Sequence, residues 1–378
     1  MKEINPFITV GYASKEYFCD RENEVSTLEK NVKNSINTTL ISPRRLGKTG
    51  LIYRFFDALN ADDADFITIY VDIFSSRSLD DFIKLLAEAI MRFYPEKTSF
   101  GRKFLKLLKG FRPLISYDSI TGEPQVSITY QTPQQKEHTL RGLLDFLDSQ
   151  NRSVVLAIDE FQQIMDYPEQ NVEALLRTYI QQLKNVRFIF CGSKTTLMLE
   201  IFSNSKRPFF SMTQYLSLKK IDRQRYFDFI VSHFETGRRT INAEAVDFIL
   251  DWTMTHTYYT QTVCSNVFAC GMRHVDLQCV KKVCAMLLQQ NEDIFLQYRQ
   301  LLTAGQWNFL IAIAKEERVT QITAQAFLSK YGIGTPANAK RLSKALINKD
   351  LLLSEATRDG VSLQVYDVFL LRWLQKAY

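Results

Sequence analysis

Residues 42–49, SPRRLGKT, combine the residue types with which a protein can hold a polyphosphate. They stand between an apolar strand-like segment at 38–41 and a segment at 51–56 whose apolar residues have helical spacing. Glycine lets the backbone approach phosphate closely, lysine can reach the β- and γ-phosphates, and a threonine hydroxyl can bind Mg²⁺. The expected nucleotide-binding residues are Ser42, Pro43, Arg44, Arg45, Leu46, Gly47, Lys48, Thr49 and Gly50, with Thr49 also a magnesium ligand.

Ser42 stands where the usual phosphate loop, G-x-x-x-x-G-K-[ST], has its first glycine. A small residue suits the tight turn at this position, so the segment still fits a phosphate loop. A chance GKT after a strand is the simpler alternative. A third possibility is that Ser42 marks a site that has lost nucleotide binding.

A second segment, SVVLAIDEFQQI at 153–164, places two carboxylates directly after an apolar run. Continuous apolar character is typical of a strand buried on both faces, and parallel sheets bind ligands beyond the carboxyl ends of their strands. We therefore expect Asp159 to hold Mg²⁺ and Glu160 to polarise the attacking water. A buried strand followed by an acidic helix cap is the alternative, which the phosphate loop upstream disfavours.

The elements that position these residues alternate between strands and helices over residues 1–215. This alternation predicts a three-layer α/β P-loop domain with a parallel sheet of the additional-strand type. Ser193 follows a strand-like run at 186–191, where such ATPases carry a polar residue that senses the γ-phosphate; a turn-forming Gly-Ser is an equal alternative. The chain has no N-K-x-D motif for guanine, which favours ATP over GTP.

Two further segments belong to this expected domain. Residues 17–24, YFCDRENE, lead into a helix with Asp20 as its expected N-cap, and Phe18 and Arg21 are candidate contacts for the base or ribose, or simply packing residues. Residues 96–135 are expected to form an insertion at the edge of the sheet, with a basic amphipathic helix at 101–110 and a hairpin at 115–130. The basic helix could bind an anionic partner, although a solvated helix face is favoured.

The remaining chain is predicted to hold two smaller domains. Residues 216–300 show helical periodicity only, as in a helical lid, whereas 301–378 show three helices and a hairpin, as in a winged helix. The last segment has ten Lys and Arg against six Asp and Glu, which accounts for +4 of the net charge of +6. Its third helix offers candidate DNA contacts, although winged helices also dock proteins; the residues are Asn338, Lys340, Arg341 and Lys344.

Length and composition limit the class of protein and the number of domains to be expected. A chain of 378 residues with 46% apolar and 23% charged residues predicts a globular protein of two or three domains. No apolar run approaches the roughly 18 residues that span a bilayer, and the N-terminus does not resemble a signal peptide, so we expect a cytoplasmic protein without a membrane partner. Buried free thiols are favoured over a zinc site for Cys264, Cys270, Cys279 and Cys284.

Taken together, these motifs resemble the archaeal-type ATPase family, P-loop proteins related to AAA+ and STAND ATPases that are also frequent in Bacteroidetes. The resemblance covers nearly the whole chain and includes PRRLGKT at 43–49, DEFQ at 159–162 and RPFF at 207–210. It implies binding of ATP and Mg²⁺, hydrolysis to ADP, and a role for Arg207 in sensing or stabilising the γ-phosphate, in cis or from another subunit of a homo-oligomer. The sequence departs from the family at Ser42 and at His256-Thr257-Tyr258, where a Gly-x-Pro-like turn is usual.

Two functions follow from this pattern. The first is a magnesium-dependent ATPase that acts as a nucleotide-driven switch, which Glu160 favours because it would serve turnover rather than binding alone. The second is a nucleotide-regulated protein that binds double-stranded DNA or a protein partner through the winged helix, with little or no hydrolysis.

Overall fold

The structure is a computed structural model that describes residues 5–62, 66–94, 98–109, 113–128, 132–357 and 360–378. The chain divides into two units, one of residues 10–220 and one that joins residues 1–9 to 221–378. Each unit is described by itself. The threefold division expected from the sequence stays a prediction.

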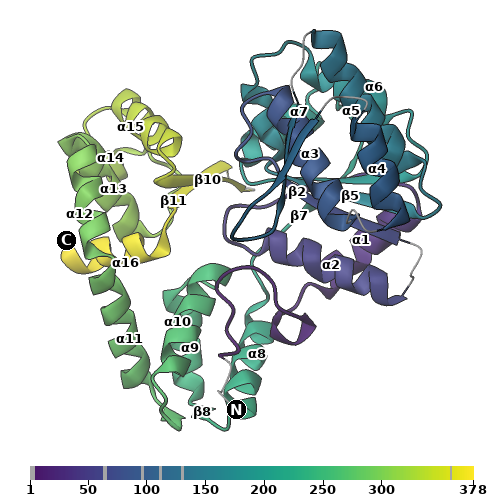
Figure 1. Cartoon of the computed structure of the whole chain (residues 1–378). Helices are drawn as coiled ribbons and strands as arrows, with labels where there is room; N and C mark the ends of the chain where they lie inside the picture. Colours follow the sequence, from purple (N-terminus) through teal and green to yellow (C-terminus); the bar gives the residue numbers. More distant parts are fainter. Residues whose placement is uncertain (1–4, 63–65, 95–97, 110–112, 129–131, 358–359) are drawn as a thin grey trace. The chain divides into compact units, whose positions relative to one another are not determined.

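A five-stranded parallel sheet organises the unit of residues 10–220 (Figure 1). Its order is β2-β5-β6-β1-β7, so β6 separates the strand before the phosphate loop from the strand that ends in the two carboxylates. This order confirms the predicted additional-strand arrangement. The strands are β1 (Thr38–Ile41), β2 (Phe66–Asp72), β5 (Ser153–Asp159), β6 (Val186–Gly192) and β7 (Gln214–Ser217).

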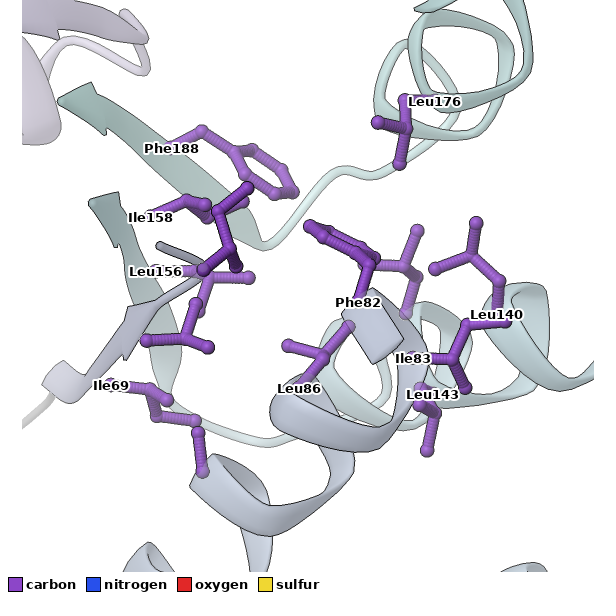
Figure 2. Packing of buried hydrophobic residues seen from close by; sticks show 14 of the residues in the cluster. Ile69, Phe82, Ile83, Leu86, Leu140, Leu143, Leu156, Ile158, Leu176 and Phe188 are labelled. Carbon is purple, nitrogen blue, oxygen red and sulfur yellow. The ribbon is translucent and has the colours of Figure 1, made fainter. Parts of the chain in front are cut away.

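Helices cover both faces of this sheet because alternate residues of its central strands point to opposite sides. On one face Val155 and Ala157 pack with α1 (Glu22–Lys33) and α2 (Lys48–Asp62). On the other face Leu156 and Ile158 pack against further helices, as Figure 2 shows. Those helices include α3 (Leu79–Phe93), α5 (Pro133–Asp148), α6 (Val172–Ile180) and α7 (Thr195–Ser203), and short 3-10 turns form η1 (Lys15–Tyr17) and η2 (Phe161–Asp166).

The expected insertion contains α4 (Ser99–Lys109) and a hairpin of β3 (Pro113–Tyr117) and β4 (Pro124–Ile128). The hairpin is a separate two-stranded sheet that packs on α3, where the amide of Val126 donates to Oε1 of the buried Glu88 at 2.9 Å. It therefore does not extend the central sheet. Gly110 and Tyr130, where the basic helix and hairpin were expected to end, lie outside the described residues.

The second unit begins with a group of helices: α8 (Arg223–Thr236), α9 (Ala243–Trp252), α10 (Thr257–Ala269), α11 (Leu277–Gln290) and α12 (Glu292–Leu301). The expectation of helices only was wrong in one detail, because β8 (Thr240–Ile241) and β9 (His274–Val275) pair in parallel. Two interhelical connections run side by side there, and their backbone groups satisfy one another. Phe7 packs among Phe229, Phe234 and Phe268, which joins the N-terminal segment to this unit.

The end of the chain has the elements of a winged helix. They are α13 (Ala304–Glu316), α14 (Gln325–Tyr331), α15 (Pro336–Asn348), the hairpin of β10 (Leu352–Thr357) and β11 (Gly360–Val365), and α16 (Val368–Ala377). Thr335 caps α15 by accepting from the amide of Asn338, as the Thr-Pro pair predicted. Of the turn expected at 358–360, residues 358 and 359 lie outside the described ranges.

Two remaining expectations concern thiols and membranes. Cys264, Cys279 and Cys284 are buried as expected, but Cys270 is exposed because it caps the end of α10. Within the described ranges no group of three or more His, Cys, Asp or Glu side chains is arranged to hold a metal. No helix in those ranges has the length and apolar character needed to cross a membrane.

Candidate nucleotide site

The phosphate loop runs from the end of β1 to Lys48, the first residue of α2. Its left-handed residues are Arg45 and Gly47, with φ of 66° and 93°, whereas Ser42 is not among the residues with positive φ. Ser42 is fully buried, its amide donates to the carbonyl of Gly192 at 3.2 Å, and its hydroxyl donates to the carbonyl of Pro43. The backbone at Ser42 therefore has no need of glycine, which explains the departure from the usual loop.

The two sequence motifs meet at the carboxyl edge of the sheet. Lys48 Nζ lies 2.6 Å from Asp159 Oδ1 and 2.9 Å from Glu160 Oε1. Lys48 and Asp159 are buried, with 8% and 3% of their surfaces exposed. Glu160 turns the chain out of β5 with a left-handed φ of 55°, a strained conformation that a non-glycine residue adopts at functional sites more often than elsewhere.

The charges of this cluster stabilise one another. Burial by itself lowers the pKa of Lys48, but the carboxylates of Asp159 and Glu160 more than offset it, so that this pKa is raised. Burial by itself raises the pKa of Glu160, but Lys48, Gln162 and Ser193 lower it below its ordinary value. Both charged forms are therefore favoured at neutral pH.

The oxygens around Asp159 suit a magnesium ion. Thr49 Oγ1 donates to Asp159 Oδ2 at 3.2 Å, so a hydroxyl and a carboxylate, the hard oxygen ligands that Mg²⁺ prefers, adjoin in the site. Tyr70 Oη also donates to Oδ2, at 2.8 Å, and the amide of Glu160 donates to Oδ1 at 2.9 Å. The residues present therefore fit the expected ion.

Tyr70 is a site residue that sequence reasoning missed. It lies on β2, which pairs with β5 so that Tyr70 is level with Ala157, two residues before Asp159. Burial first, and Asp159 second, raise the pKa of its hydroxyl, which therefore remains a donor. Strand periodicity placed Tyr70 on a strand, but only the register of two strands distant in sequence brings it to Asp159.

Glu160 is held on its other oxygen by neutral donors. Ser193 Oγ donates to Glu160 Oε2 at 2.8 Å, and Gln162 Nε2 donates to the same oxygen. A Cβ at Gly192 would lie 2.4 Å from Gln162 Oε1, so glycine there permits close packing and is not present to turn the chain. Ser193 thus lies beside Glu160, and its role at the γ-phosphate stays a prediction, whereas Gln162, although part of DEFQ, was assigned no role.

Arg44 reaches the same group of residues from the phosphate loop. Its Nε donates to Ser193 Oγ at 3.4 Å, and its side chain is half-buried. Phe18 lies beside the start of α2, where a Cβ at Gly50 would be 2.9 Å from Phe18 Cε2. Arg44 is part of the phosphate loop and Phe18 lies close to it. Contact of either residue with nucleotide stays a prediction.

Arg21, a predicted contact of the base or ribose, is bound by other groups of the protein. Arg21 is buried; its Nη1 contacts Glu24 Oε1 at 3.0 Å and its Nη2 donates to the carbonyl of Lys219 at 2.6 Å. Arg21, with φ of 82°, also occupies the N-cap of α1, so the expectation of Asp20 as the cap was wrong. Asp20 itself is left-handed, and the helix therefore starts one residue later.

Arg207 is bound by two carboxylates. Its Nη1 lies 2.9 Å from Glu173 Oε1 on α6, and its Nη2 lies 2.5 Å from Glu200 Oε1 on α7. No contact in the described structure joins Arg207 to Lys48, Asp159 or Glu160. Its role at the γ-phosphate stays a prediction.

In the second unit, the candidate DNA contacts lie on α15. Lys340, Arg341 and Lys344 are exposed. Asn338 is half-buried; its amide nitrogen donates to the carbonyl of Ile333 at 2.8 Å, and its oxygen accepts from Arg341 at 2.9 Å. Asn338 therefore fixes the start of α15 and orients Arg341.

Comparisons with known proteins agree with this arrangement. Residues 18–257 match a family described as an ATPase domain predominantly from Archaea, and residues 293–376 match one described as a probable winged helix domain. No curated protein sequence matches the chain.

Several solved structures share the fold. The Walker-type ATPase PABY2304 of Pyrococcus abyssi has a TM-score of 0.66 at 17% identity, over 98% of this chain and 99% of that one. The Aeropyrum pernix ORC2 protein in its ADPNP–ADP complexes has a TM-score of 0.58 at 13% identity, over 99% and 97%. The Aeropyrum pernix ORC1 protein in complex with DNA has a TM-score of 0.51 at 12% identity, over 95% and 93%. At these identities the likeness concerns the fold, and the family match, which spans more than half of the sequence, shows that the chain belongs to the ATPase family predominantly from Archaea.

Proposed function

We propose that this protein binds ATP together with Mg²⁺ and hydrolyses it to ADP and phosphate. The observation that carries the proposal is the contact of Lys48 with both Asp159 and Glu160, with Thr49 beside Asp159. These are the residue types that P-loop enzymes use for the β- and γ-phosphates, the metal and the attacking water. Family membership and the nucleotide complexes of the related ORC2 fold support the same conclusion.

In this mechanism the phosphates of ATP bind at the amides of the loop and at the positive end of α2. Lys48 then exchanges Glu160 for a γ-phosphate oxygen. Glu160 keeps its neutral donors, Ser193 and Gln162, and accepts a proton from the attacking water. Thr49 and Asp159 would hold Mg²⁺, which when bound neutralises charge on the phosphates.

The test is steady-state ATP hydrolysis with and without Mg²⁺ for four variants beside the wild type. Lys48→Ala and Glu160→Gln should abolish turnover, and Glu160→Gln should retain bound ATP. Lys184→Ala and Glu137→Gln change the same residue types at exposed positions and should turn over normally. Wild-type protein without turnover, or a Glu160→Gln variant as active as wild type, would contradict the proposal.

We further propose that turnover serves a switch, in which ATP and ADP set different affinities of the winged helix for double-stranded DNA. The supporting observation is the exposed group of Lys340, Arg341 and Lys344 on α15, together with the DNA complex of the related ORC1 fold. Neutralising phosphates with such cations makes binding weaken as salt increases.

Fluorescence anisotropy with a labelled duplex tests this second proposal in ATP and in ADP over a range of salt concentrations. Arg341→Ala and Lys344→Ala should each weaken binding and reduce the salt slope by about one. Lys282→Ala, an exposed lysine of the same unit, is the matched control. Binding that ignores salt and both α15 variants would argue for a protein partner instead.

A further inference from the structure

We propose that Tyr70 is a positioning residue of the magnesium site, where it holds the carboxylate of Asp159 in the orientation that favours binding of the metal. The inference rests on the proposed ATPase function and deepens it, because Tyr70 belongs to neither sequence motif. Tyr70 would act only through Asp159, and its hydroxyl would transfer no proton in this role.

The pairing of two strands brings Tyr70 to the site. β2 and β5 are parallel, with Tyr70 level with Ala157 and Asp72 level with Asp159. Tyr70 and Ala157 both pack with residues of α2, on one face of the sheet. Residues two apart along a strand point to the same face, so Asp159 lies on this face as well. Tyr70 and Asp159 are therefore diagonal neighbours, which a side chain as long as tyrosine can connect.

The carboxylate of Asp159 accepts from donors on both of its oxygens. Oδ1 accepts from Lys48 Nζ at 2.6 Å and from the amide of Glu160 at 2.9 Å. Oδ2 accepts from Tyr70 Oη at 2.8 Å and from Thr49 Oγ1 at 3.2 Å. Tyr70 thus makes the shorter of the two contacts on Oδ2, and a rotation of the carboxylate would break it. The hydroxyl of Tyr70 therefore keeps Asp159 beside Thr49, the other proposed magnesium ligand.

An uncharged donor is well suited to orient a metal ligand. Lys48 already places one positive charge between Asp159 and Glu160. A phenol hydroxyl is neutral at pH 7, so Tyr70 orients Asp159 without cancelling the negative charge that attracts Mg²⁺. Carboxylates that bind metals are commonly held by such hydrogen bonds, and loss of the donor typically lowers metal affinity about 10–100-fold.

The experiment measures binding of a non-hydrolysable ATP analogue by calorimetry, in EDTA and at increasing free Mg²⁺, beside steady-state ATP hydrolysis. Tyr70→Phe removes only the hydroxyl. Tyr53→Phe, the matched control, removes the same group from a ring whose centroid lies 5.2 Å from that of Tyr70. Tyr70→Gln and Tyr70→Met form a second pair, similar in length, of which only glutamine can donate a hydrogen bond. This pair decides the matter if Tyr70→Phe does not fold.

Tyr70→Phe should need about tenfold more Mg²⁺ than wild type to reach half of the full increase in affinity for the analogue. In EDTA it should bind the analogue like wild type, because the phosphate loop is unchanged. Its hydrolysis rate should return close to that of wild type at saturating Mg²⁺, which a general packing defect would not allow. Tyr70→Gln should need less Mg²⁺ than Tyr70→Met, and Tyr53→Phe should match wild type.

The inference is overturned if Tyr70→Phe binds the analogue with the same dependence on Mg²⁺ as wild type, or if it loses as much affinity in EDTA as in Mg²⁺. Equal Mg²⁺ requirements of Tyr70→Gln and Tyr70→Met would also overturn it. In each case an active wild type leaves the proposed function standing. A wild type that neither hydrolyses ATP nor binds the analogue more tightly with Mg²⁺ would instead overturn the proposed function, and this inference with it.

Discussion

Replacing Lys48 by alanine should destabilise the nucleotide-free protein as well as abolish turnover. Lys48 is the buried cation shared by Asp159 and Glu160, at 2.6 and 2.9 Å. Removing one partner of a buried ion pair costs about 3–5 kcal/mol because the remaining charge is left uncompensated. Asp159 keeps its donors Thr49 and Tyr70, so we expect the lower end of this range, about 3 kcal/mol.

Thermal unfolding without nucleotide measures this effect at pH 8 and pH 5. For a domain of this size, each kcal/mol lowers Tm by about 2–4 °C, so Lys48→Ala should unfold about 6–12 °C below wild type at pH 8. In wild type the pKa of Glu160 is lowered, so its stabilising contribution is present above the pKa of the unfolded chain and lost as pH falls. Without Lys48, the largest influence that lowers this pKa is gone while burial still raises it, so the pKa of Glu160 is higher than in wild type and the difference in Tm should narrow as pH falls to 5.

Two variants make this prediction specific. Adding Glu160→Gln to Lys48→Ala removes one of the two carboxylates that lack their cation in the variant. This double variant should therefore recover part of the decrease in Tm. Lys184→Ala, at an exposed lysine of the same unit, should unfold like wild type at both pH values. A Lys48→Ala protein that unfolds at the wild-type temperature at pH 8 would refute the argument from buried charge. So would a difference in Tm from wild type that widens at pH 5.

Three further predictions test individual contacts by urea unfolding. Tyr70→Phe removes a donor to the Asp159 carboxylate and should cost about 1.5–3 kcal/mol, whereas Tyr53→Phe, on the ring that packs 5.2 Å from Tyr70, should cost little; equal losses would contradict this. Gly50→Ala places a methyl group 2.9 Å from Phe18 and should cost about 1–2 kcal/mol, which Phe18→Leu should partly relieve. Asn338→Ala removes two hydrogen bonds at the start of α15 and should lower the free energy of unfolding by about 1 kcal/mol, unlike Lys344→Ala at an exposed position. Equal stability of these two variants would count against the role of Asn338.

The fold could be predicted because the sequence patterns that indicate its strands and helices are local and strong. Buried strands read as continuous apolar runs, helices as periodic ones, and a phosphate loop before one strand-end carboxylate pair specifies a parallel sheet. The observed order, with the strand before Ser193 next to the phosphate-loop strand, agrees with the additional-strand type expected from the sequence. Because all these strands are parallel, their carboxyl ends share one edge, which is why Lys48, Asp159 and Glu160 could be expected to meet.

The site contacts and the helix cap that the sequence did not predict depend on three-dimensional contacts that a single sequence does not show. Tyr70 reaches Asp159 through the register of β2 on β5, and Gln162 reaches Glu160 only because Glu160 turns the chain left-handed. The cap of α1 was misplaced because Arg21, a poor capping residue, is fixed by Glu24 and by the carbonyl of Lys219, far along the chain. For Tyr70 and Arg21 it was a tertiary contact that overrode the local preference.

The contacts of Glu160 link its strength as a base to nucleotide binding in the proposed mechanism. Glu160 faces a cation on one oxygen and neutral donors on the other, and these contacts lower its pKa and make it a weak base. In the proposed mechanism Lys48 exchanges Glu160 for the γ-phosphate, which carries more charge than a carboxylate, and the pKa of Glu160 would then rise because burial raises it. By this proposal Glu160 would become an effective base once Lys48 turns to the γ-phosphate, whereas Ser193 and Gln162 would keep its orientation unchanged.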